Sequence, residues 1–237
     1  MANIIFYNAN LVDSTINSKG AILVQEDKIL AVAQGNFSTE EKALCFQEFF
    51  DTKDDIQLID CQNKTLMPSF IDMHVHFRYP GQTQKEDLNS GLHAAIAGGF
   101  GTVVAMPNTN PVVSSSDTAH QIEDEANKYN LAEVIQTVSI TKDFSGTDTS
   151  HIDNLEGISV VTEDGHDVSS SLAMLDAMSK CSVKGILVDC HCEDESFTAS
   201  AKEYRKRALE NKEDSELAKI QAEADLQEAN RLLALAE

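Results

Sequence analysis

The sequence predicts an α/β fold built from parallel strand–helix–strand units. From Met67 onward, short apolar runs with strand character alternate with longer segments of helical spacing, which is the pattern of such units. Hydrophobic residues make up 42% of the 237 residues, so the chain can bury a sizeable core. The residues alone leave two arrangements open, a doubly wound sheet and a (β/α)8 barrel.

The first 66 residues differ from the rest and predict a small β-rich domain. Asn3–Val12 and Ala21–Val32 are rich in Ile, Leu and Val, and Glu26-Asp27 predicts a tight hairpin within the second run. Residues 36–55 are polar and are expected to form a mostly exposed, partly helical excursion. Ile56–Leu66 then returns to strand character.

Residues 67–237 are expected to form the α/β domain. The predicted strands are Phe70–Phe77, Thr102–Met106, Glu133–Ile140, Ile158–Thr162 and Ile186–His191. The predicted helices are Glu86–Ala97, Ser116–Asn130 and Ser170–Lys180. Serines before the second and third helices are candidate N-caps, and Gly98-Gly99 predicts the end of the first.

The tail, Glu193–Glu237, is helical in composition and densely charged. The apolar residues of its last part are spaced too irregularly for a sustained coiled coil, so we expect an amphipathic helix that covers a sheet. Only five strands of the barrel type are predicted, whereas a closed barrel has eight. The sheet is therefore expected to be open, or the sequence to be cut short.

Composition narrows the classes of partner. The formal net charge is −21, and so acidic a surface repels phosphate backbones and anionic membranes, which argues against nucleic acid and membrane partners. Five cysteines without regular spacing do not form a disulfide framework. Because the start of the chain has no secretory signal and no run is long enough to span a membrane, the sequence predicts a cytoplasmic protein.

The segment Asp72–Arg78 carries the strongest chemical signal. Side chains of a strand alternate between its faces, so His74 and His76 share one face, and Asp72 and Arg78 are expected on it too. Two imidazoles at this spacing can chelate one ion, and zinc commonly binds neutral histidine with carboxylate companions. The alternative is an edge strand with a hydrated polar face. The position after Pro68, between strand–helix units, favours a metal site.

His191 is a second candidate ligand, because it ends a predicted strand and barrel active sites form at that end. Its neighbours Cys190 and Cys192 are interpreted as small core residues and not as thiolate ligands, since they lie on the opposite strand face and no second cysteine pair accompanies them.

Two loops after predicted strands offer further polar groups. Glu163-Asp164 could supply a carboxylate that bridges two metal ions, although Asp164-Gly165 also favours an ordinary turn. Asn108 lies in a short loop between Pro107 and Pro111, where it can offer a ligand both a donor and an acceptor, or can form an Asx turn.

Taken in order, these segments resemble the dihydroorotases of the amidohydrolase superfamily. The resemblance is carried by Pro68–Gly81, Lys85-Glu86-Asp87, Gly98-Gly99-Phe100 and Met106–Thr109. It extends from about Met67 to the end of the chain, and residues 1–66 resemble the small β-domain before the barrel. The resemblance therefore implies a partial (β/α)8 TIM-type barrel, preceded by a small β-domain, with a zinc centre of one or two Zn2+ ions.

The resemblance also implies roles for individual residues. His74, His76 and His191 resemble zinc ligands, and Asp164 resembles the carboxylate that bridges the metals. The family usually has Asp-Asp-Gly where this chain has Glu163-Asp164-Gly165, which leaves open which acid bridges. Arg78 and Asn108 resemble the residues that hold the substrate carboxylate.

The implied reaction is the interconversion of carbamoyl aspartate and dihydroorotate in pyrimidine biosynthesis. In this family a further zinc-binding histidine and the aspartate that transfers the proton lie beyond the point where this sequence stops, so we expect a truncated chain that is inactive alone. Two alternatives stay open, a hydantoinase or allantoinase and a non-catalytic homologue. The expected partner is a small-molecule substrate, and association into a homo-oligomer is left open.

Overall fold

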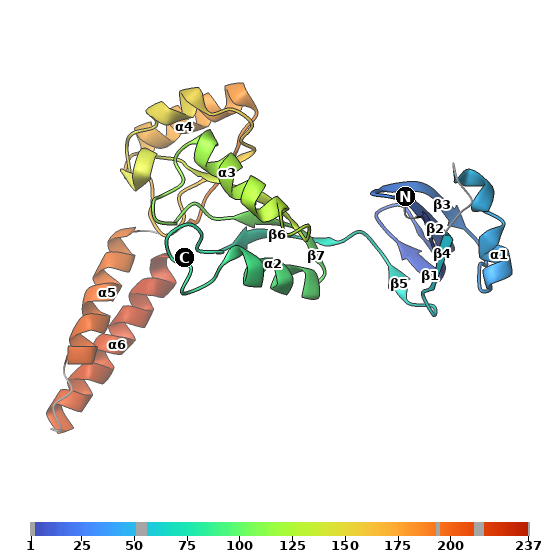
Figure 1. The fold of residues 1–237 in the computed structure, drawn as a ribbon. Coiled ribbons are helices and arrows are strands. Elements are labelled where there is room, and N and C mark those ends of the chain that lie inside the picture. Colours follow the sequence, from blue (N-terminus) through green and yellow to red (C-terminus); the bar gives the residue numbers. More distant parts are fainter. Residues whose placement is uncertain (1–2, 51–55, 193–194, 211–215, 237) are drawn as a thin grey trace. The chain divides into compact units, whose positions relative to one another are not determined.

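The computed structural model describes residues 3–50, 56–192, 195–210 and 216–236 (Figure 1). Parts of the predicted excursion and tail, residues 51–55 and 193–194, lie outside these ranges. The chain divides into two compact units, Met1–Ser69 and Phe70–Glu237. None of the described helices is long and apolar enough to cross a membrane.

The first unit is a small sheet with one short helix. Its strands are β1 (Asn3–Val12), β2 (Asn17–Gln25), β3 (Lys28–Gln34), β4 (Ile56–Asp60) and β5 (Thr65–Leu66). The sheet order is β3-β2-β1-β4, with β5 also paired to β1. β2 and β3 are antiparallel around Glu26-Asp27, which confirms the predicted hairpin. The predicted strand Ile56–Leu66 is wrong as one element, because a turn at Gln62-Asn63, both at positive φ, divides it.

The excursion after β3 contributes to the core of this unit. It contains α1 (Glu40–Leu44) and the 3-10 helix η1 (Gln47–Phe49). Ala43 and Phe50 are buried with residues of β1 and β2, such as Ile5 and Leu23. The described part of the excursion, residues 36–50, is thus mostly exposed and partly helical, as predicted, and its few buried apolar side chains pack against the sheet.

The second unit contains parallel strands in two short sheets, a mixed α/β arrangement. The strands are β6 (Phe70–Val75), β7 (Phe100–Ala105), β8 (Glu133–Gln136), β9 (Val138–Ser139), β10 (Val160–Thr162) and β11 (Leu187–Asp189). The sheet orders are β6-β7-β8 and β9-β10-β11, and every pairing is parallel. Only Thr137 separates β8 from β9, so the two sheets follow one another along the chain.

The break at Thr137 corrects the prediction of one strand over Glu133–Ile140. The backbone N–H and the hydroxyl of Thr137 both donate to the carbonyl of Ala105, at 3.0 and 2.7 Å. Gln136, only 2% exposed, donates its side-chain amide to the same carbonyl at 3.1 Å. These bonds attach the break to the end of β7, from which the next loop begins.

Three helices alternate with the strands, as the sequence predicts. They are α2 (Leu88–Ala97), α3 (Ser116–Asn127) and α4 (Ser171–Lys184), and α2 and α3 lie against the first sheet (Figure 1). Their N-caps are Asp87, Ser115 and Ser170, each of which accepts a backbone N–H of the first turn. The apolar faces of helices and strands share one buried cluster, which includes Leu92, Val103 and Ile122.

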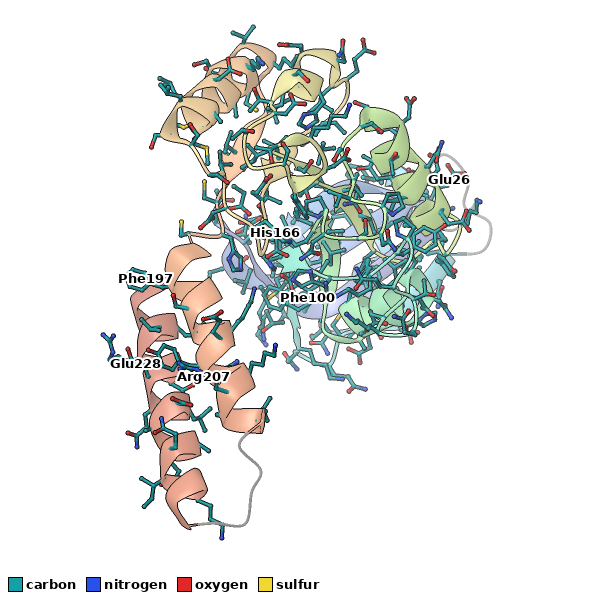
Figure 2. All side chains as sticks on the ribbon, turned by 90° about the vertical axis from the view of Figure 1, so that its left-hand side faces the viewer. Glu26, Phe100, His166, Phe197, Arg207 and Glu228 are labelled. Carbon is teal, nitrogen blue, oxygen red and sulfur yellow. The ribbon has the colours of Figure 1, made fainter. Side chains whose placement is uncertain are left out.

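The tail forms two helices, α5 (Glu195–Glu210) and α6 (Glu216–Ala236), which run side by side (Figure 1). Ala201 of α5 is buried with Ala229 and Leu232 of α6, and Phe197 packs against them (Figure 2). The prediction that the last helix covers a sheet is therefore wrong, because its buried face contacts α5.

Candidate metal centre

Two histidines meet at the end of β6. His74 belongs to this strand and His76 follows its last residue, Val75. Their Nε2 atoms lie 3.2 Å apart and their rings are nearly perpendicular, at 75°. Asp72 does not join them, because its carboxylate accepts the backbone N–H of His74 at 3.1 Å. The alternation of the strand thus brings the two imidazoles together.

A buried carboxylate faces these histidines from the end of β10. The side chain of Asp164 is 4% exposed, and its oxygens lie 3.8 Å from His74 Nε2 and 3.4 Å from His76 Nε2. His191, two residues beyond β11, brings its Nε2 within 3.3 Å of the same carboxylate. Three imidazole nitrogens from two strand ends therefore surround one acid from a third.

The spacing of these atoms fits a metal ion. In a tetrahedral zinc site, bonds of about 2.0–2.1 Å place neighbouring ligand nitrogens roughly 3.3 Å apart. The ligand atoms of His74, His76 and Asp164 all lie within 4.8 Å of one another. Each histidine side chain is also partly exposed, at 42% for His74, 29% for His76 and 35% for His191, so an ion can enter. The described residues thus offer a preformed set of nitrogen and oxygen donors.

The neighbouring acid, Glu163, points elsewhere. Its carboxylate accepts the backbone N–H of Thr141 at 2.9 Å and also the hydroxyl of Thr141. Burial raises the pKa of the Glu163 carboxyl, and the bonds from Thr141 act in the opposite direction. Of the two acids that the sequence left open, only Asp164 faces the histidines.

The electrostatic setting of His76 favours its neutral form. Burial lowers the pKa of His76, the attraction of Asp164 opposes this, and the positive charge of Arg78 reinforces it. Neutral imidazole is the form that binds metals. The surroundings of this side chain thus suit a metal ligand.

Asn108 lies between two of the candidate ligands. Its side-chain oxygen is 3.0 Å from Nδ1 of His76, and its amide nitrogen donates to Asp164. The loop between the two prolines therefore brings Asn108 to the metal-ligand group itself.

Arg78 lies beyond the end of β6 and its backbone adopts a positive φ of 56°. The expectation that it shares a strand face with the histidines is therefore wrong, since alternation ends where the strand ends. Its charge still acts on His76. Within the described ranges, no salt bridge joins its guanidinium to a carboxylate.

The cysteines beside His191 are not core residues. Cys190 and Cys192 are both exposed, and Cys192 has a positive φ of 59°. The prediction failed because the strand β11 ends at Asp189, before either cysteine. Another histidine, His166, lies against the ring of Phe144, with ring centroids 4.9 Å apart.

Sequence reasoning missed the residues that hold the ligand-bearing loops. Thr141 binds Glu163 from a loop 22 residues earlier, and Gln136 and Thr137 bind the carbonyl of Ala105, three residues before Asn108. One signal in the sequence could have found them. Gln136 and Thr137 are polar residues inside an otherwise apolar strand, and buried polar groups need hydrogen-bond partners.

Comparison with known proteins gives one family. The model of the dihydro-orotase-like family matches residues 63–206. The dihydroorotase of Clostridium botulinum is 33% identical over 216 residues, which are 90% of this chain and 50% of that protein. The dihydroorotase of Brevibacillus brevis is 40% identical over 141 residues, covering 59% and 33% of the two chains. The chain thus spans about half the length, or less, of these curated relatives.

Solved structures extend the likeness to the fold. The L-hydantoinase (dihydropyrimidinase) from Arthrobacter aurescens matches all of this chain and 51% of its own, with a TM-score of 0.63 and 19% identity. The β-aspartyl dipeptidase from Fervidobacterium islandicum matches 96% of this chain and 64% of its own, with a TM-score of 0.53 and 16% identity. At such identities the likeness concerns the fold alone.

Proposed function

The chain belongs to the dihydroorotase-like family, and we propose that it supplies the histidine–aspartate side of the active site of a zinc-dependent cyclic amide hydrolase. The proposed reaction interconverts carbamoyl aspartate and dihydroorotate. We further propose that residues 67–237 are part of a (β/α)8 barrel and residues 1–66 its small β-domain. The observation that carries the proposal is the convergence of three imidazoles on the buried carboxylate of Asp164.

The donor set indicates which metal the site would hold. Three imidazole nitrogens and one carboxylate are typical zinc ligands. His74, His76 and His191 would hold the metal with Asp164, which has one oxygen toward His76 and the other toward His74 and His191. With both oxygens of Asp164 directed toward histidines, these residues would hold one or two Zn2+ ions. When bound, zinc supplies a nucleophile from water near neutral pH and polarises an amide carbonyl.

The chain's own residues would bind and orient the substrate. Dihydroorotate carries a carboxylate on its ring, and a guanidinium can pair with a carboxylate through two parallel hydrogen bonds. Arg78, which lies close enough to influence His76, would thus hold the ring beside the metal ligands. We assign proton transfer to no residue of this chain.

Dihydroorotate is preferred to hydantoin as the substrate for two reasons. The sequence relatives named dihydroorotase are 33–40% identical, whereas the hydantoinase structure is 19% identical and bears on the fold alone. Hydantoin also lacks the ring carboxylate with which the guanidinium of Arg78 would pair.

Zinc stoichiometry tests the metal site. The wild-type chain should bind one or two zinc ions, and a His74→Ala, His76→Ala double variant should lose them. His93→Ala is the matched control, because His93 is exposed on α2 and its ring bonds only to the backbone of Asn89. Undiminished zinc in the double variant would refute the assignment.

Calorimetry on the zinc-loaded chain tests the substrate. Arg78→Met should weaken dihydroorotate binding by about 2–4 kcal/mol, the scale of a lost charged partner at a site. Hydantoin binding should hardly change, since it has no carboxylate. An equal loss for both ligands would show that Arg78 acts on the fold and not on the substrate.

A further inference from the structure

The amide of Asn108 contacts two candidate zinc ligands at once, and their chemistry fixes its orientation. The carboxylate of Asp164 can only accept a hydrogen bond, so the NH2 group of Asn108 must face it. The side-chain oxygen is then left for His76, at 3.0 Å from Nδ1. Because that oxygen can only accept, Nδ1 of His76 must carry the proton.

This arrangement has a direct consequence for the metal site. A neutral imidazole with its proton on Nδ1 has its lone pair on Nε2. Nε2 of His76 is the atom that lies 3.2 Å from His74 and 3.4 Å from Asp164. Asn108 therefore selects the tautomer of His76 whose free lone pair points into the candidate metal centre.

We propose that Asn108 is a positioning residue that sets the tautomer of His76 and the orientation of Asp164 for metal binding. The inference rests on the proposed function, and it gives Asn108 a task different from holding the substrate carboxylate. Metal-binding histidines usually donate their second ring N–H to an acceptor that fixes the ring, and here the acceptor is the oxygen of Asn108.

The loop holds Asn108 in place without any ligand. The N–H groups of Thr109 and Val113 both donate to the carbonyl of Pro107, at 2.8 and 3.0 Å. The amide of Gln136 also reaches the carbonyl of Met106, at 3.5 Å. The side chain of Asn108 is thus presented from a backbone that is already bonded on both sides.

Substrate-free zinc affinity tests the inference, because a residue that only binds substrate cannot change it. Asn108→Leu keeps a similar volume but removes both hydrogen bonds. Competition with a chromophoric chelator should give zinc binding 10- to 100-fold weaker than in the wild-type chain, the usual effect of losing such a partner. The matched control is Asn127→Leu, an exposed site at the end of α3, which should bind zinc as the wild type does.

A second measurement reads the tautomer of His76 directly, and its decisive result comes from the wild-type chain. Long-range 1H–15N spectra of the metal-free wild-type chain at neutral pH should show His76 as the Nδ1–H tautomer. In Asn108→Leu, the same signals should move toward the commoner Nε2–H form. Wild-type His76 in the Nε2–H form would overturn the inference even if the variant failed to fold.

The outcomes separate this inference from the proposed function. If the wild-type chain binds no zinc, the proposed metal site fails. If it binds zinc and Asn108→Leu binds it equally well, the positioning role fails while the metal site stands. Cobalt(II) in place of zinc adds a further check, because a changed visible spectrum in Asn108→Leu would report altered ligand geometry, and an unchanged one would argue against the inference.

Discussion

Replacing Thr141 by valine tests whether Glu163 anchors the loop next to the candidate metal centre. The Thr141 hydroxyl donates to the Glu163 carboxylate and accepts the buried N–H of Gly146 at 2.9 Å. Valine has nearly the same shape, so no cavity opens and only these bonds are lost. A hydrogen bond to a charged group contributes about 1.5–3 kcal/mol, and an unsatisfied buried N–H costs about 1–3 kcal/mol. Because the two effects are not fully additive, we expect Thr141→Val to lower the free energy of unfolding by roughly 2–4 kcal/mol.

Urea unfolding at pH 7.5 measures this loss, and Thr141→Ser is its control. Serine keeps both hydroxyl bonds and loses one methyl group, which costs about 1 kcal/mol in a core. Thr141→Val should therefore be clearly less stable than Thr141→Ser. If the two variants unfold at the same urea concentration, the methyl group and not the bond to Glu163 holds this loop, and the reasoning is wrong.

Two further predictions concern backbone geometry and pH. In urea unfolding, Gly81→Ala should be at least about 2 kcal/mol less stable than Gly165→Ala. Both glycines have a positive φ, but only a Cβ at position 81 would collide with a neighbour, because it would lie 1.9 Å from the carbonyl oxygen of Asn110. Equal losses of stability would refute this. Burial lowers the pKa of His151 below 6.5, so its stabilising contribution is present above that pH and is lost as the pH falls through the lowered pKa. From pH 7.5 to 5.5 the wild type should therefore lose more stability than His151→Gln, which can keep the bond to the carbonyl of Ser139. Parallel losses in urea unfolding at the two pH values would contradict this.

The order of strands and helices could be predicted because it depends on local signals. The helices α2, α3 and α4 begin at caps that the sequence displays, such as Asp87 or Ser115, and α2 ends at Gly98. The apolar runs between these caps are short and become strands. The break at Thr137 could not be predicted in this way, because the run through it is uniformly strand-like. The break depends on bonds to Ala105, a residue 32 positions earlier.

The candidate metal centre was predictable to the extent that one strand determines it. His74 and His76 are two residues apart, so the period of a strand is enough to place them together. The choice between Glu163 and Asp164 needs tertiary information, because the two acids are adjacent in the sequence and differ in the direction that each side chain faces. That direction depends on Thr141, which lies on another strand end and binds one of the two acids. The prediction that Arg78 shares a strand face with the histidines failed because β6 ends three residues before Arg78.

The candidate metal ligands are supplied by the ends of neighbouring strands, which explains why few residues define the site. Every candidate ligand lies at or just beyond the end of a strand: His74 is the last residue but one of β6, His76 follows β6, Asp164 follows β10 and His191 follows β11. Asn108 follows β7 in the same way. Within each sheet, strands that pair in parallel end at the same edge, which places His76 near Asn108 and Asp164 near His191. The contacts of Asp164 with His74, His76 and Asn108 then join the two sheets at this edge. Side chains on the helices can then change without moving the ligands.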